Sequence, residues 1–346
     1  MPILSRVFLV AASVVFFTSE LTMAAAQAST DTLSAQKSDP IKMGWMQGSP
    51  PPQDKQLTFA DGSFFAFPAL RWSASNMRLF MPTVNVSRGI GNPQPLPYRL
   101  DSTIDAVQFI PLNSTTPMTW EESLWENYTD GILILHKGTV VYERYFGALT
   151  ENGQHAAMSV TKSITGILAA SYVADGLLDD SKLVREYLPE LSNSAYGDAT
   201  VRQVLDMTTA LQFSEEYANP NAEIWAFSEA GWLVERVGGK PLNELLADKI
   251  WRKIGMEQDA YFSVDELGTA FAGGGFNAGL RYFARLGELI RNDGVWHGEQ
   301  VIPRQAVRDI AQGGNKQVFS KSGLIALAGW SYRNMWWHTV EGNHAQ

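Results

Sequence analysis

The sequence predicts an α+β fold in which an antiparallel sheet is flanked by helices and a helix-rich subdomain is attached. Two apolar, β-branched segments around a Lys-Gly turn, within residues 131–147, are typical of a β-hairpin. Helical periodicity dominates the middle of the chain, and an aromatic, strand-like segment follows at residues 329–340. Strands before and after a run of helices favour helices packed on an antiparallel sheet over an alternating βαβ arrangement.

Length and composition narrow the class of protein. A chain of 346 residues with 45% hydrophobic residues suits one large domain or two small ones with a real core. The formal net charge is −9 and no Lys/Arg-rich run occurs, so nucleic acid is not an expected partner. The chain has no cysteine, which excludes disulfides, a thiol nucleophile and a cysteine-ligated zinc site. Its five histidines are scattered and lack the H-E-x-x-H spacing, so we expect no metal site.

The first 28 residues have the layout of a secretory signal peptide. Arg6 precedes an apolar run over residues 7–17, and residues 26–28 (AQA) supply a small-x-small cleavage site. The run is too short to span a bilayer comfortably, and the absence of cysteine rules out a lipoprotein-type attachment. We therefore expect residues 1–28 to lie outside the fold. The mature protein is expected to be periplasmic or secreted, without a stable membrane anchor.

Residues 29–115 are predicted to form an extended N-terminal arm that packs on a larger body, residues 116–346. The arm is rich in Pro, Gly and aromatic residues, and it shows no sustained helix or strand period. Turn signals occur at residues 50–52 (PPP), 60–62 (ADG) and 89–93 (GIGNP). The aromatic side chains between residues 64 and 80 supply apolar groups that would attach the arm to the body.

The body begins with the hairpin and continues with helices. Apolar residues recur at threes and fours from Ile164 to Leu177 and predict a helix that ends at Asp175-Gly176. Further helices are predicted within residues 183–188, 201–207 (capped at Thr200), 233–254, 280–290 and 306–310. Residues 329–340, rich in Trp and Tyr, are predicted to form a strand.

Ser159 and Lys162 are the candidate catalytic pair. On a helix, a spacing of three residues places both side chains on one face and within reach of each other. A serine hydroxyl becomes a good nucleophile when a partly desolvated lysine takes its proton. The same S-x-x-K pattern occurs at Ser34 and Lys37, in a polar stretch with no core around it. The position of Ser159, between a hairpin and the N-terminus of a helix, is what favours it over Ser34.

Two other features favour structural interpretations. His136 lies beside the hairpin turn and is interpreted as a solvated turn residue in preference to a catalytic base. Gly273-Gly274-Gly275 precedes a helix, but it lacks the Lys-Ser/Thr of a P-loop and the full dinucleotide fingerprint. A tight turn with close backbone approach is therefore favoured over phosphate binding.

With these residues identified, the chain resembles the serine β-lactamase and penicillin-binding superfamily, in its class C and esterase-like branch. Within that branch it is most similar to the 6-aminohexanoate-dimer hydrolases, which cleave nylon oligomers. The resemblance extends from about residue 43 to the end. It is carried by residues 43–48 (MGWMQG), 157–163 (AMSVTKS), 201–209 (VRQVLDMTT), 271–277 (FAGGGFN) and 329–334 (GWSYRN).

The resemblance implies a serine hydrolase with a serine β-lactamase-like fold. Ser159 would be the acylated nucleophile and Lys162 its general base, with the backbone N–H of Ser159 as one oxyanion donor. The substrate would be a small-molecule amide, lactam or ester, and no metal or organic cofactor would be used. A tyrosine shares the proton transfer in this superfamily, and Tyr217, in Tyr217-Ala218-Asn219, matches the Y-x-N letters. Tyr217 is thus either a site residue or an ordinary loop tyrosine.

The chain also departs from the family pattern. A segment that would carry the principal tyrosine is missing between Trp225 and Gly231, which indicates a deletion. Lys321-Ser322-Gly323 fits the third motif, K-[ST]-G, but it precedes the Trp-rich strand and is interpreted as a chance match. The family's C-terminal strands are expected to be absent, which would leave an unpaired, apolar sheet edge.

Three functions remain open at this point. The first is an exported serine hydrolase that acts through a Ser159 acyl-enzyme. The second is a truncated or non-catalytic member of the superfamily that keeps the nucleophile helix without a complete site. The third is a penicillin-binding or β-lactamase activity on the same fold. The natural substrate and the oligomeric state do not follow from the sequence.

Overall fold

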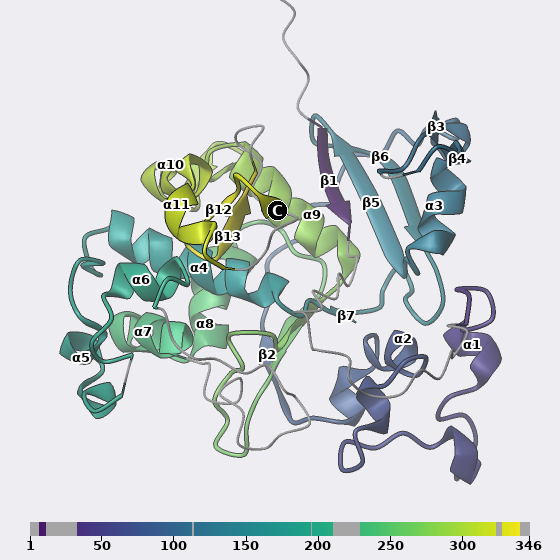
Figure 1. Ribbon diagram of the computed structural model, residues 1–346, viewed down its shortest axis with the longest axis horizontal. Helices are drawn as coiled ribbons and strands as arrows, with labels where there is room; N and C mark the ends of the chain where they lie inside the picture. Colours follow the sequence, from purple (N-terminus) through teal and green to yellow (C-terminus); the bar gives the residue numbers. More distant parts are fainter. Residues whose placement is uncertain are drawn as a thin grey trace, which may run out of the picture. The chain divides into compact units, whose positions relative to one another are not determined.

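The structure of the protein is a computed structural model, which describes residues 7–11, 33–112, 114–194, 196–209, 229–322 and 327–339 (Figure 1). The chain forms two compact units. Unit 1 contains residues 1–80, 96–155 and 279–284, and unit 2 contains residues 81–95, 156–278 and 285–346. Helices and antiparallel strands occur in both, which confirms the predicted α+β fold.

The predicted hairpin is the centre of unit 1. Strand β5 (Gly131–His136) pairs antiparallel with β6 (Thr139–Tyr145). Lys137 and Gly138, at φ +53° and +78°, form the two-residue turn between them, and positive φ at both central positions suits the right-handed twist of a hairpin. Four of the six β5 residues are apolar and buried, and two of them, Ile132 and Ile134, form a core with Tyr142 and with Leu124 of helix α3 (Trp120–Glu126).

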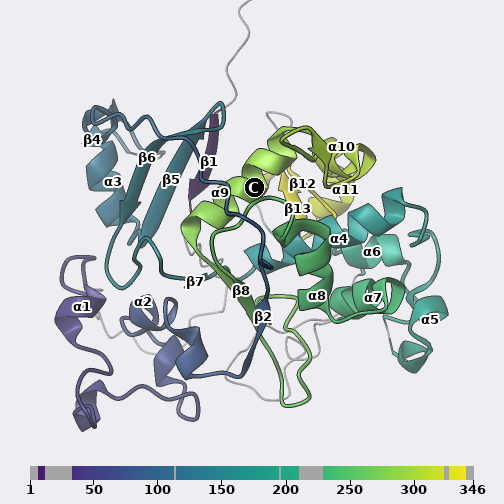
Figure 2. The same ribbon diagram turned by 180° about the vertical axis from the view of Figure 1, so that it is seen from behind.

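The remaining elements of unit 1 are short. They are α1 (Pro40–Met43), η1 (Gln53–Lys55), η2 (Ser63–Phe65), α2 (Leu70–Ser73), η3 (Met77–Leu79), η4 (Ile104–Ala106), β3 (Gln108–Phe109) and β4 (Met118–Thr119). Strand β3 pairs with β4, and α3 begins at a capping box formed by Thr119 and Glu122. Figure 2 shows α3 and the β3–β4 pair beside β6.

A buried ion-pair cluster fastens the start of the described arm in unit 1. Arg71 donates to the backbone carbonyls of Ala35 and Ser38 and to a carboxylate oxygen of Asp130, 3.2 Å away. The other Asp130 oxygen lies 3.4 Å from Nε2 of His155. A buried charge needs such partners, because an unpaired one loses its hydration without compensation. Residues 35–38 are therefore anchored by side-chain hydrogen bonds from Arg71, whereas the sequence suggests only a polar stretch with no core around it.

The apolar N-terminal segment lies on the sheet of unit 1. Residues Val7–Ala11 form strand β1, which pairs antiparallel with β5 from Val7 opposite His136 to Ala11 opposite Ile132 (Figure 1). The sequence predicts that residues 1–28 lie outside the fold, whereas these five residues pair with the backbone groups along the second edge of β5. Cleavage of the segment as a signal peptide stays a prediction.

Unit 2 contains a second antiparallel sheet, with strands in the order β2-β8-β9-β7. These are β2 (Thr83–Val86), β8 (Ala260–Ser263), β9 (Phe276–Ala278) and β7 (His155–Ala156). Strand β2 belongs to the segment predicted as arm, yet its Val86 is fully buried and pairs with Ala260. Hence residues 81–95 belong to unit 2, while the rest of the arm described here belongs to unit 1.

The helices of unit 2 include those predicted from the sequence. In chain order they are α4 (Val160–Ala174), α5 (Val184–Tyr187), η5 (Pro189–Leu191), α6 (Val201–Leu205), α7 (Glu229–Gly238), α8 (Leu242–Leu246), the π-helical turn η7 (Ala247–Trp251), α10 (Arg304–Gln312) and α11 (Lys316–Phe319). Residues 233–254, predicted to contain one helix, include parts or all of α7, α8 and η7, and η5 and α11 are not predicted. Helix α9 (Leu280–Arg291) passes from unit 1 into unit 2 at Arg285. As predicted, Thr200 caps α6 and Asp175-Gly176 ends α4.

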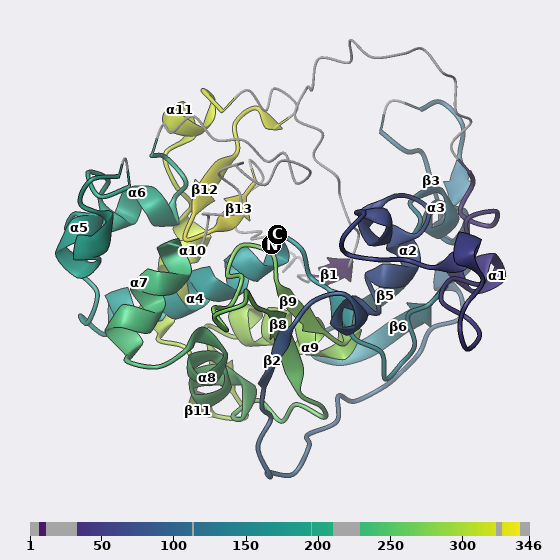
Figure 3. The ribbon, with the colours of Figure 1, turned by 90° about the horizontal axis from the view of Figure 1, so that it is seen from below.

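Helix α4 lies at the centre of unit 2. Twelve of its fifteen residues are buried, and it packs against α7 and α10, as Figure 3 shows. Such complete burial explains its weak amphipathicity, because a helix covered on all sides has no face that must be polar. In the part of the chain that the structure describes, no helix is both long and apolar enough to cross a membrane.

The predicted C-terminal strand is instead a hairpin. The short pair β10 (Val295–Trp296) and β11 (Glu299–Gln300) is followed, after two helices, by β12 (Ser331–Arg333) and β13 (Trp336–His338). Asn334 and Met335 separate β12 from β13 and have φ of +47° and +62°, so the chain reverses there. The apolar character of the segment predicts strands correctly, but it does not indicate the turn.

Candidate active site

Ser159 is the N-cap residue of α4 and is exposed to solvent. Met158, immediately before it, has a φ of +45°, an unfavourable backbone conformation for a residue with a side chain. Strain of this kind persists where the surrounding structure fixes it, and it gathers at functional sites. A fixed elbow at Met158 presents the hydroxyl of Ser159 at the start of a buried helix.

Lys162 lies one helical turn further and points back to the serine. Its Nζ is 3.1 Å from Ser159 Oγ, as the spacing of three residues predicts, and only 6% of the side chain is exposed. The same amine donates a hydrogen bond of 2.8 Å to the backbone carbonyl of Gly273. The pair thus consists of an accessible hydroxyl and a buried amine whose direction is set by a backbone carbonyl.

The glycine run forms part of this site. Added side chains at Gly274 and Gly275 would collide with Phe271, so the turn requires glycine, as predicted. Thr165 Oγ1 donates to the carbonyl of Ala272 at 3.1 Å, which ties the glycine-rich turn to the second helical turn of α4. Helix α4 therefore carries Lys162 and also, through Thr165, holds the Gly273 carbonyl against the Lys162 amine.

Strand β9 fixes the beginning of α4 from the other side. The N–H of Phe276 donates to Thr161 Oγ1 at 3.1 Å, and the N–H of Ala157 donates to the Phe276 carbonyl at 2.8 Å. Thr161 is fully buried. Ser159 consequently lies between two residues, Ala157 and Thr161, that are both bonded to β9.

The start of α4 provides N–H groups beside the serine. The amides of Val160, Thr161 and Lys162 donate to carbonyls three residues earlier. Within the described part of the chain, the amide of Ser159 has no such acceptor. A free N–H at the positive end of a helix favours negative charge that develops nearby. The arrangement suits attack of Ser159 on a carbonyl group whose oxygen becomes an anion.

Most of the other candidate residues are among those that the structure describes. Tyr217 is outside the described residues. Lys321 and Ser322 lie exposed in the turn after α11 and not on a strand, in keeping with a chance match; Gly323 is outside the described residues. Ser34 and Lys37, the second S-x-x-K match, are both exposed. His136, at the end of β5, is half-buried.

A metal centre is not indicated by the described residues, which contain no group of three or more His, Asp or Glu side chains placed to hold an ion.

Two contributors to the site are missing from the sequence prediction. The carbonyl of Gly273 is one, and the Oγ1 of Thr161 is the other. The glycine run signals a close backbone approach, but no local pattern shows that it approaches Lys162, 111 residues away.

Comparisons with known proteins show what the chain is similar to. Residues 120–278 match the family model for β-lactamases, a span that includes Ser159, Lys162 and Gly273. A 6-aminohexanoate-dimer hydrolase from Paenarthrobacter ureafaciens is 28% identical over 314 residues, which are 79% of this chain and 78% of that one. A solved structure from Bacillus anthracis, provisionally described as a 6-aminohexanoate-dimer hydrolase, is 26% identical over 84% of each chain with a TM-score of 0.72. The chain is therefore a β-lactamase-fold hydrolase related to the 6-aminohexanoate-dimer hydrolases.

Proposed function

We propose that this protein hydrolyses a small amide or ester through an acyl-enzyme on Ser159. The distance of 3.1 Å between Ser159 Oγ and the buried Nζ of Lys162 carries the proposal. A contact of this length connects the nucleophile directly to its base. The match of residues 120–278 to the β-lactamase family model supports the same roles for Ser159 and Lys162.

The positions of these atoms support the following sequence of steps. Lys162, as a neutral amine, takes the hydroxyl proton while Ser159 Oγ bonds to the substrate carbonyl carbon. The carbonyl oxygen becomes an oxyanion, which the N–H of Ser159 stabilises. When the intermediate collapses, the bond to the leaving group breaks and the ammonium of Lys162 returns its proton to that group. Water then attacks the acyl-enzyme, with Lys162 as base, and releases the acid and free Ser159.

The substrate class rests on the relatives. The name of the Paenarthrobacter protein states that it hydrolyses the 6-aminohexanoate dimer, a linear amide. We extend that class to this chain as a linear amide or ester, with no metal and no organic cofactor in the reaction. Residues 1–28 are proposed to direct export, so that the enzyme acts on small molecules in the periplasm or outside the cell.

Covalent labelling with a fluorophosphonate tests the catalytic assignment. Wild-type protein should be labelled once, and Ser159→Ala should remove the label. Ser34→Ala is the matched control, since Ser34 belongs to the same S-x-x-K pattern but is exposed with its lysine, and this variant should be labelled like wild type. Absence of labelling in wild type, or persistence in Ser159→Ala, would contradict the proposal and favour a non-catalytic member of the family.

Turnover separates the amide or ester hydrolase from a β-lactamase. We expect release of product from a linear amide or an activated ester to exceed opening of a chromogenic cephalosporin at equal concentration. The reverse order, with Ser159→Ala inactive on both, would assign the protein to β-lactam substrates.

A further inference from the structure

The turn between β12 and β13 has an unusual sequence for its conformation. Arg333 pairs with Trp336 across a two-residue loop, and both loop residues have positive φ. Such a turn ordinarily contains Asn-Gly, because glycine adopts positive φ at no steric cost. Here the second position is Met335, which is 98% buried. Contacts from outside the hairpin must therefore hold this turn in place.

Several of these contacts come from the first turns of α4. Ser163, which follows Lys162, donates its Oγ proton to the Met335 carbonyl at 2.9 Å. The indole N–H of Trp336 donates to the Ser163 carbonyl at 3.0 Å. Gly166 lies one turn further along, where any added side chain would collide with the carbonyl of Asn334. The turn is thus bonded to the residue next to Lys162 and packed on the following turn of the helix.

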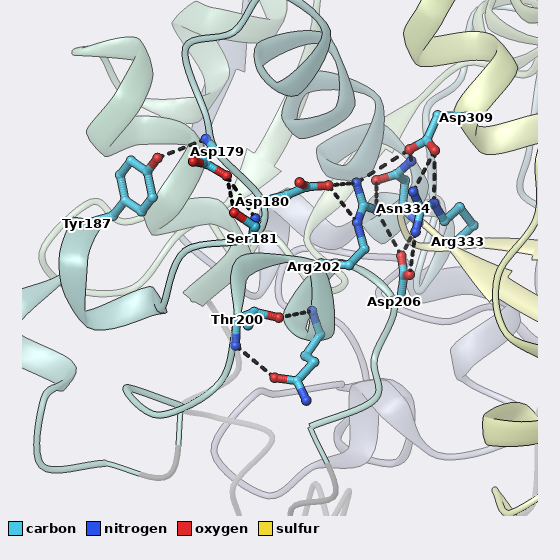
Figure 4. Close-up of polar contacts among 11 residues, drawn as sticks. Asp179, Asp180, Ser181, Tyr187, Thr200, Arg202, Asp206, Asp309, Arg333 and Asn334 are labelled. Carbon is cyan, nitrogen blue, oxygen red and sulfur yellow. Dashed lines mark hydrogen bonds and ion pairs between the residues drawn. The ribbon is translucent and has the colours of Figure 1, made fainter.

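The side chain of Asn334 is in turn fixed by a network of charged groups, shown in Figure 4. Its amide oxygen accepts from Arg202 at 2.7 Å, and its amide nitrogen donates to Asp309 at 2.7 Å. The backbone N–H of Asn334 donates to Asp206 at 3.1 Å. Asn334 is completely buried, so each of these bonds replaces a bond to water.

The network connects two helices, α6 and α10, and the turn at Asp180 to the hairpin. Arg202, on α6, also bonds to Asp180 and to Asp206, while Arg333 bridges Asp206 and Asp309 of α10. Burial alone would raise the pKa of Asp309, but hydrogen bonds from Arg333 and Asn334 outweigh burial and hold that pKa below its ordinary value. Two arginines therefore face three aspartates, and the amide side chain of Asn334 joins this network to the turn.

The structure assigns a positioning role to the Asn334–Met335 turn: we propose that it fixes the first turn of α4, so that Lys162 stays at hydrogen-bond distance from Ser159. The inference rests on the proposed acyl-enzyme function and deepens it. Asn334 and Ser163 would touch neither substrate nor reacting atoms and would act through Lys162. The charged network supplies the rigidity, and the two bonds to Ser163 transmit it to the helix.

The test is a double-mutant cycle on the rate of fluorophosphonate labelling. In Asn334→Gly, glycine accepts the positive φ of this position. The substitution removes the side-chain amide that joins Arg202 to Asp309 and leaves the backbone N–H that donates to Asp206. Ser163→Ala is the second, milder variant, since it removes a single hydrogen bond to the turn. We expect both to slow labelling per folded molecule, Asn334→Gly by about tenfold to a hundredfold, as for a displaced catalytic group.

The same changes are then made in a Lys162→Ala background, where residual labelling is followed at raised probe concentration. There they should alter the labelling rate by less than about twofold, because the effects of residues that act through one group are not additive. Thr119→Ala, which removes the helix cap of α3 in unit 1, serves as the control for a general loss of stability and should label at the wild-type rate.

The possible outcomes separate the two proposals. If wild type is labelled and Asn334→Gly slows labelling by the same factor with and without Lys162, the positioning role is overturned. The catalytic assignment of Ser159 is then left intact. Wild-type rates in both Asn334→Gly and Ser163→Ala overturn the positioning role as well. Wild type that is not labelled overturns both proposals.

Discussion

Replacement of Gly166 by alanine sets two physical effects against each other within α4. Glycine in a helix interior is unfavourable relative to alanine by about 1 kcal/mol, so helix propensity alone predicts a more stable protein. The structure predicts the opposite, because the added methyl group would overlap the backbone carbonyl of Asn334. Asn334 cannot easily move away, since it is completely buried and bonded to Arg202, Asp206 and Asp309.

The magnitude follows from the difference between these effects. Forcing an extra carbon into a packed core costs about 1–3 kcal/mol, and a backbone neighbour places this site toward the upper end of that range. After subtraction of the helical gain, Gly166→Ala should lose about 1–2 kcal/mol of unfolding free energy. The thermal midpoint should fall by about 2–4 °C for each kcal/mol in a unit of this size.

Urea and thermal unfolding of the purified protein measure the change. Gly238→Ala, at the end of α7, is the matched control, because the groups its side chain would meet are the Tyr172 hydroxyl and the end of the Leu245 side chain. Such groups can shift, so Gly238→Ala should cost less than Gly166→Ala. A Gly166→Ala protein that is more stable than wild type would refute the close contact between α4 and the turn.

Three further outcomes are expected. The lowered pKa of Asp309 means that its contribution to stability is present above the unfolded pKa of about 3.9 and is lost as pH falls through the folded value. Asp309→Asn should therefore make unfolding free energy depend less steeply on pH in that acid range, and an unchanged slope would contradict the assignment. Burial, together with the hydrogen bond to Asp105, raises the pKa of Tyr142 to about 12. The stabilisation that follows is complete below the unfolded pKa of about 10 and is lost as pH rises through the pKa of Tyr142 in the folded protein. A difference titration of wild type against Tyr142→Phe should therefore show a tyrosine that ionises near pH 12 and not near pH 10. Removal of residues 1–28 should speed hydrogen exchange of the β5 amides that face β1, and exchange at the rate of the full chain would contradict the pairing.

The sequence predicts what depends on neighbours along the chain. The β5–β6 hairpin, the cap at Thr200 and the end of α4 at Asp175-Gly176 all follow from local patterns, and the structure confirms them. The contact between Ser159 and Lys162 belongs to the same class, because a spacing of three residues on one helix brings the two side chains together.

Features that depend on distant contacts escape such patterns. The turn at Asn334 and Met335 lacks the Asn-Gly signal, and it forms because Ser163, Arg202 and Asp309 hold it. The pairing of residues 7–11 with β5 is likewise absent from a prediction that assigns the apolar run to a signal peptide. A strand-forming apolar segment and an apolar signal peptide have similar composition. The two interpretations therefore differ only in which part of the chain, if any, the segment contacts.

Capture of the acyl-enzyme is the most direct test of the central claim. The protein is mixed with an activated ester of a small acid, quenched in acid within the turnover time, and digested after Lys and Arg. We predict the mass of the acyl group on the peptide of residues 145–162, located at Ser159, and no such mass in Ser159→Ala. Turnover of the ester without an adduct on that peptide, or an adduct that persists in Ser159→Ala, would contradict the account.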